Sequence, residues 1–192
     1  MKFRSLTLTT LLALTMMLPS CAPPSWVAEA ESIAKVALPI VQGITSIAGA
    51  SPAVSQAVND INLLITLFDK YQAAPAAGTL QQIQAGLNTA NADIAQIMPA
   101  AGIKNTTTQS KVAAVLQLVT SEFSNIASLV PQASGLGVRD SGLGPKPETR
   151  IPNPALKLPF TAKEFKAQYN RIVTARTGDA ECDQAFSGKE LK

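Results

Sequence analysis

The chain has 192 residues, of which 15% are charged and 5% are aromatic, and its formal net charge is +3. It contains no histidine, which excludes Ser-His-Asp and Cys-His catalysis and every zinc site that needs imidazole. Lys2 and Arg4 supply two of the positive charges, so the remainder of the chain is near +1. Such a balance gives no indication of nucleic-acid binding.

Residues 1–20 have the order of a secretory signal peptide. Lys2 and Arg4 precede an apolar run, from Leu6 to Leu18, and small residues follow it. The run contains four threonines and falls short of the roughly 20 apolar residues that a transmembrane helix needs. We therefore expect residues 1–20 to be removed during export.

The residues at the end of this segment, Leu18-Pro19-Ser20-Cys21, add a more specific signal. They resemble the lipobox of bacterial lipoprotein precursors. The resemblance implies cleavage between Ser20 and Cys21, and acyl chains such as palmitate on Cys21. Two or more acyl chains give a stable membrane anchor. With Ala22 after the cysteine, the resemblance also implies the periplasmic face of the outer membrane.

Two alternatives to lipidation remain. Ordinary signal cleavage after Ala22 would release a secreted protein, although Pro23 just after the cut is expected to hinder that peptidase. An uncleaved membrane helix is the second alternative, and the length of the apolar run disfavours it.

Residues 21–131 are predicted to form a bundle of four helices. Their apolar residues recur every three or four positions, the spacing that places one apolar stripe along each helix. The four stripes are Trp26, Ala30, Ile33, Ala37, Ile40, Ile44 and Ile47; Val54, Val58, Ile61, Ile65 and Phe68; Leu80, Ile83, Leu87, Ala90, Ile94 and Ile97; and Val112, Leu116, Val119, Phe123, Ile126 and Val130.

Capping residues mark the starts of three of these helices. Ser51 with Pro52 is a cap followed by a proline at the first helical position. Thr79 with Gln82 has the spacing of a capping box, and Asn105–Thr108 offers several caps for the fourth helix. The connections are short, which favours antiparallel neighbours. The predicted fold is therefore all-α, an antiparallel up-down-up-down four-helix bundle.

Pro39 lies inside the first stripe. A proline within a helix removes a hydrogen-bond donor and clashes with the preceding turn. We therefore predict a kink or break near Val36 to Leu38, and a break would leave two shorter helices in place of one.

Residues 132–160 are predicted to form a Gly/Pro-rich linker. Ser-Gly-Leu-Gly occurs at 134–137 and again at 141–144, without the Lys-Ser/Thr that a phosphate-binding loop would require. Pro145, Pro147 and Pro152 then favour an extended backbone.

Residues 161–192 are predicted to form a basic C-terminal helix and tail. Thr161 with Glu164 is a capping box, and an apolar stripe follows it at Phe165, Tyr169 and Ile172–Val173. So short a helix is marginal in isolation, so it should dock on the bundle or on a partner.

The C-terminal part of the chain is more basic than the bundle. Residues 139–176 contain eight basic and three acidic side chains, whereas residues 21–138 contain four basic and six acidic ones. The simplest interpretation is a solvated segment; the alternative is contact with an anionic envelope component. On that alternative, the partner surface consists of Lys163, Lys166, Arg171 and Arg176.

The remaining chemistry-bearing residues do not predict an enzyme, a metal site or a cofactor site. We expect the bundle carboxylates to serve surface solubility; they are Asp60, Asp69, Asp93 and Glu122. The chain has two cysteines, so lipidation of Cys21 leaves Cys182 unpaired, and we expect that thiol to be inert.

These observations favour a lipid-anchored cell-envelope protein with a scaffold or spacer role and an envelope-protein or peptidoglycan partner. The alternative is a carrier of an apolar ligand or lipid, because Ala30, Ala37 and Ala90 could leave space inside the bundle. A covalent link from Lys192 to peptidoglycan, as in some lipidated helical envelope proteins, is a third hypothesis. The weakly charged helix faces are also compatible with a homo-oligomer.

Overall fold

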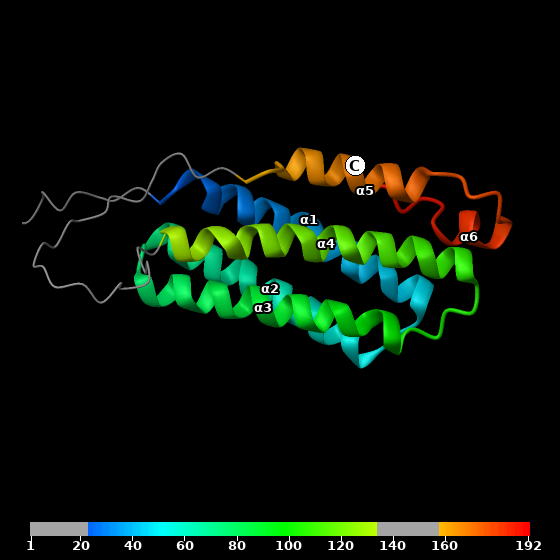
Figure 1. The fold of residues 1–192 in the computed structure, drawn as a ribbon, viewed down its shortest axis with the longest axis horizontal. Helices are drawn as coiled ribbons and strands as arrows, with labels where there is room; N and C mark the ends of the chain where they lie inside the picture. Colours follow the sequence, from blue (N-terminus) through cyan, green and yellow to red (C-terminus); the bar gives the residue numbers. More distant parts are fainter. Residues whose placement is uncertain (1–22, 134–157) are drawn as a thin grey trace, which may run out of the picture.

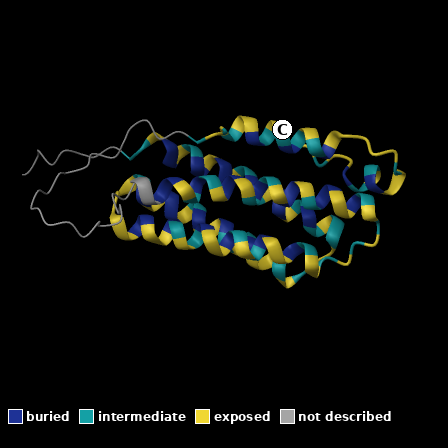
Figure 2. Ribbon diagram, viewed as in Figure 1, coloured by how far each residue is buried: buried dark blue, intermediate teal, exposed yellow. Residues whose placement is uncertain are grey.

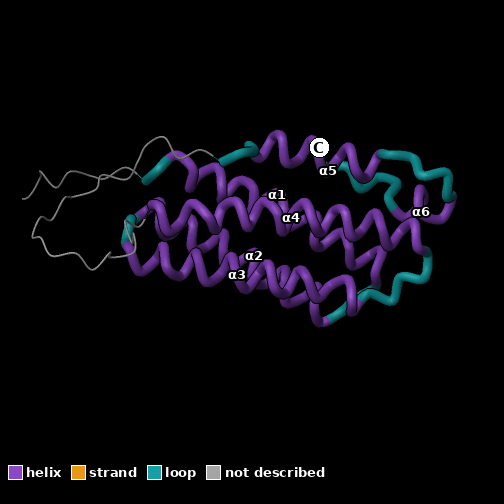
Figure 3. Tube along the Cα trace, in the orientation of Figure 1, coloured by secondary structure: helices purple, strands orange, loops and turns teal. Residues whose placement is uncertain are grey.

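A computed structural model describes residues 23–133 and 158–192 of the chain. Within those ranges the secondary structure is entirely helical, which confirms the predicted fold class. The six helices are α1 (Ser25–Ala48), α2 (Pro52–Ala73), α3 (Ala77–Ala100), α4 (Thr106–Ala133), α5 (Ala162–Thr174) and α6 (Ala180–Ala185). The long helices α1 to α4 alternate in direction and form the four-helix bundle, with α5 and α6 packed along one side (Figures 1 and 3).

The predicted apolar stripes form the core of the bundle. Every stripe residue of α3 and α4 is buried, and in α1 only Ile47 is partly exposed. In α2 the stripe is rotated slightly, so that Ala57 and Leu64 are buried while Val58 and Ile65 are only partly buried. The dark-blue inner faces in Figure 2 show this arrangement along the four helices.

Two of the predicted helix starts are confirmed and one is wrong. The Ser51 hydroxyl accepts a hydrogen bond from the Val54 amide at 3.3 Å, and the Asn105 side chain accepts one from the Thr108 amide at 2.8 Å. The box expected at Thr79 does not form, because α3 already begins at Ala77 and Thr79 is a buried residue within it. Burial in the helix takes precedence here over the local capping preference.

The expectation that Pro39 divides the first helix is also wrong. Helix α1 runs without a break from Ser25 to Ala48, and Pro39 lies on its exposed side. Its neighbours Ala37, Ile40 and Val41 are almost completely buried against the bundle. Packing on both sides of the proline thus keeps the two halves in one helix, and solvent can bond the carbonyl that the proline leaves unpaired.

The C-terminal helix docks on the bundle, which is one of the two outcomes expected from the sequence; the other was docking on a partner. Helix α5 packs against both α1 and α4, burying Phe165, Tyr169 and Val173, and the capping box of Thr161 and Glu164 is formed. Because α1 begins, α4 ends and α5 begins at the same end of the bundle, α5 runs parallel to α1 (Figure 1).

The chain after α6 turns back along α5. The Tyr169 hydroxyl donates to the Lys189 carbonyl at 2.9 Å. The Asn170 side chain donates to the Leu191 carbonyl and accepts from the Leu191 amide, both at 2.9 Å. The last residues are therefore held on α5 by several hydrogen bonds.

We predict that Phe165→Ala releases α5 from the bundle. Phe165 is fully buried, and truncating such a phenylalanine costs about 3–5 kcal/mol. Amide hydrogen exchange of α5 should accelerate by more than about a hundredfold. The exposed Lys163→Ala on the same helix is the control and should change exchange little. Equal exchange in the two variants would contradict this account of α5.

Candidate functional site

The structure divides the predicted basic surface into two places. Lys163 and Arg171 are exposed on α5, and Lys166 is half-buried there, with its ammonium donating to the backbone carbonyl of Lys192. Arg176 lies beyond the end of α5, where it lines a cavity. We define the basic face of α5 as Lys163, Lys166 and Arg171.

The cavity lies where α4, the end of α5, and α6 with the following tail meet. Its volume is about 440 Å³. Charged and apolar side chains from all three places line it, and they include Lys111, Val173, Arg176, Asp183, Phe186 and Glu190. It is thus built from residues that are distant in the sequence, at the end of the bundle opposite the start of α1 (Figure 1).

Lys111 is the buried cation of this cavity. Its side chain projects from α4, the residue is 7% exposed, and its ammonium donates to the Ala175 carbonyl at 2.8 Å. The ammonium also lies 4.7 Å from the centre of the Phe186 ring, a cation–π contact. These contacts fix the position of the charge, and no carboxylate among the described residues forms an ion pair with it.

Asp183 places a negative charge in the same cavity. Its Oδ1 accepts hydrogen bonds from the amide and the hydroxyl of Thr177, both at 2.9 Å. These bonds, with a smaller contribution from the charge of Lys111, lower the pKa of Asp183 below its ordinary value. The carboxyl is therefore ionised at neutral pH.

Sequence reasoning missed this cavity, and only one signal pointed to it. Lys111 is the only basic residue between 105 and 138, in a helix whose first turns are otherwise uncharged. Nothing in the local pattern relates it to Asp183 or Glu190, which α5 and α6 bring near it.

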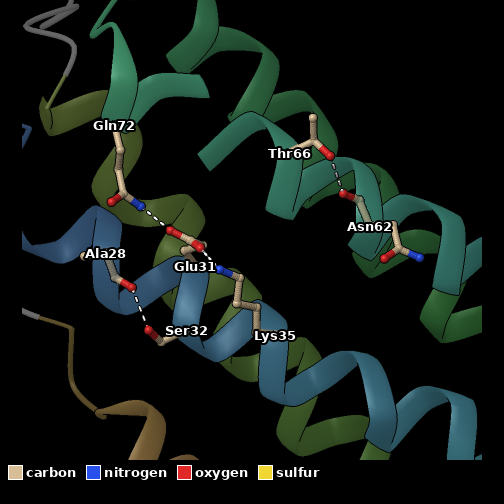
Figure 4. A network of polar contacts seen from close by, with 7 residues as sticks. All are labelled: Ala28, Glu31, Ser32, Lys35, Asn62, Thr66 and Gln72. Carbon is tan, nitrogen blue, oxygen red and sulfur yellow. Dashed lines mark hydrogen bonds and ion pairs between the residues drawn. The ribbon is translucent and has the colours of Figure 1, made fainter. Parts of the chain in front are cut away.

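Glu31 forms a polar clamp between α1 and α2. Its carboxylate accepts from the Lys35 ammonium on the same helix and from the Gln72 side chain on α2 (Figure 4). Burial alone would raise the pKa of Glu31, but the hydrogen bonds with Lys35, Gln72 and Asp69 lower it. These satisfied bonds indicate a structural role.

The expectation that the bundle carboxylates lie on the surface is wrong for Glu122. That residue is 1% exposed, and burial raises its pKa despite a hydrogen bond with Asn125. Its Oε2 has no hydrogen-bond partner in the described part of the chain. The stripe pattern did not reveal this because Glu122 lies beside the stripe, on a flank that becomes buried.

Asp60 of α2 and Asp93 of α3 lie together and are each only partly exposed, whereas Asp69 is exposed as expected. Burial, then a hydrogen bond and charge repulsion from Asp93, raise the pKa of Asp60 from 3.8 to about 6. Neither carboxyl group lines the cavity. The pair therefore couples proton binding to the packing of α2 on α3.

The remaining sites can be placed briefly. Cys182 is completely buried on α6, so its thiol is not available at the surface of the fold. Residues 23–133 and 158–192 contain no group of three or more Cys, Asp or Glu side chains that could hold a metal ion. Ser20, Cys21 and most of the 132–160 linker lie outside the described residues.

One helix in the described ranges, Thr106–Val130 within α4, is long and apolar enough to cross a membrane. Half of its most apolar window is buried inside the bundle. No protein-family model, curated protein or solved structure matches the chain. Function is therefore inferred from the residues and their arrangement.

We predict that Asp93→Asn stabilises the protein at pH 7. Between about pH 4 and pH 6 the folded state retains a proton on Asp60 that the unfolded state has lost, so the free energy of unfolding falls as pH rises through this window. Asp93→Asn removes the repulsion and should weaken that fall. Urea denaturation at pH 4 to 7 measures it.

A double variant is the control for the carboxylate pair. Asp60→Asn alone should have a similar effect, and the two changes together should stabilise by less than the sum of the single effects. Strictly additive effects, or an unchanged pH dependence in Asp93→Asn, would contradict the coupling.

Proposed function

We propose that this protein is a lipid-anchored cell-envelope scaffold without enzymatic activity. An acyl group on Cys21 would hold it to the membrane, and the bundle would act as a spacer. The basic face of α5 would contact an anionic envelope partner, for which the acidic peptide stems of peptidoglycan are our choice. The observation that carries this proposal is the short distance in sequence between Cys21 and the first helix: α1 begins at Ser25.

The position of α1 gives the spacer a direction. The lipidated cysteine would lie at the end of the bundle where α1 starts, and α1 has 24 residues. At 1.5 Å per residue that helix extends about 36 Å. The opposite end, with α6, would then stand roughly that far from the anchor.

The packing of α5 supports an outward basic face. Phe165, Tyr169 and Val173 are buried toward α1 and α4, whereas Lys163 and Arg171 are exposed. Docking therefore fixes the helix while leaving these two charges free to meet a partner. Their effect on binding should be electrostatic and should weaken with salt.

We predict that removal of Cys21 releases the protein from the membrane. The wild-type mature chain should begin at Cys21, fractionate with membranes and show the added mass of acyl chains. A protein whose residues 1–22 are replaced by an ordinary cleavable signal peptide lacks Cys21, cannot be acylated and should appear in the soluble periplasmic fraction. Cys182→Ala, which removes the other thiol, should stay with the membrane. A soluble wild-type protein that begins at another residue would refute the anchor.

We further predict that the basic face of α5 binds peptidoglycan. The soluble protein that lacks Cys21 should sediment with purified sacculi, and Lys163→Gln with Arg171→Gln should weaken binding several-fold by removing two exposed charges. The control is Lys70→Gln with Lys104→Gln, which removes two exposed charges elsewhere. Equal loss in both pairs, or no sedimentation of the parent protein, would contradict the proposed partner.

A further inference from the structure

We propose that the cavity between α4, α5 and α6 binds a small zwitterion, namely an amino acid or dipeptide with both of its termini free. Peptidoglycan binding by the basic face of α5 does not imply this site, and the anchor at Cys21 is not needed for it. The argument rests on the size of the cavity, on the two signs of charge that line it and on the burial of Lys111.

The size of the cavity suits a small ligand. Its volume of about 440 Å³ lies within the range of roughly 300–1,000 Å³ that is usual for small-molecule sites. Phe186 and Val173 provide apolar surface in its wall, and the other functional groups around it are polar or charged. A ligand with a short apolar side chain between charged ends fits this lining.

Lys111 is the strongest indication of an anionic group in the ligand. A buried ammonium is costly unless it is paired with a negative charge; the Ala175 carbonyl and the Phe186 ring contact Lys111, and the Asp183 charge acts on it without forming an ion pair, so the compensation is only partial. Arg176 adds a second, exposed cation to the same cavity. A ligand carboxylate between Lys111 and Arg176 would complete the pairing.

The carboxylates determine the other end of the ligand. Asp183 is held in position and ionised by Thr177, and the exposed Glu190 lines the cavity from the C-terminal tail. The two carboxylates would repel a ligand that is only anionic, and the two cations would repel a ligand that is only cationic. A ligand with one ammonium and one carboxylate avoids both repulsions.

Calorimetric titration of the purified full-length protein in detergent micelles tests this. The probes are L-alanine, L-alanyl-L-alanine, its N-acetyl derivative and its C-terminal amide. We expect binding of L-alanine or the free dipeptide, and a loss of at least about tenfold when either terminus of the dipeptide is capped. A free protein chain end carries only one of the two charges. If one of the two capped probes bound as tightly as the free dipeptide, the site would recognise a chain end, and the proposal would be overturned.

Variants assign the two ends of the ligand. Arg176→Gln changes an exposed residue, so it should keep the fold while weakening the free dipeptide about tenfold and leaving the C-terminal amide unaffected. Lys70→Gln, which removes an exposed charge from α2, should not alter binding. Failure of both L-alanine and the free dipeptide to bind the folded wild-type protein, or equal loss in the two variants, would overturn the site. Sedimentation with sacculi is measured separately, so either proposal can fail alone.

Discussion

The basic face of α5 and the cavity beside Lys111 both depend on one contact, the burial of Phe165, Tyr169 and Val173 against α1 and α4. It turns the charged side of α5 outward, and it brings the end of α5 over Lys111. A 13-residue helix would hardly persist in water without this apolar contact. The bundle is therefore the support that gives the C-terminal segment a defined shape.

The helices of this fold were predictable because their signals are local. Apolar residues three and four apart define each stripe, and Asn105 and Thr161 cap the helices that follow them, within a few residues of sequence. The failures at Thr79 and Pro39 have one cause. Tertiary burial outweighed a local preference that, taken alone, would start the helix later at Thr79 and interrupt it at Pro39.

The candidate site was less accessible from the sequence because it is not local. Lys163 and Arg171 could be placed on an exposed helix face from spacing alone. Lys111 and Asp183 line the same cavity only because α5 and α6 dock on the bundle and the chain turns between them. The spacing of apolar residues along the sequence does not predict such a contact. Glu122 shows the same difficulty, since its flank of α4 becomes buried only in the assembled fold.

Helix α4 ends and α5 begins at the same end of the bundle, beside the start of α1 (Figure 1). The two helix ends that the intervening residues join therefore lie at one end of the fold, so the connection need not span its length. The entropic cost of closing a flexible loop grows only logarithmically, so doubling its length costs about 0.6 kcal/mol. Evolution could lengthen or shorten this connection, or insert a further module into it, with little effect on the packing of α5 against α1 and α4.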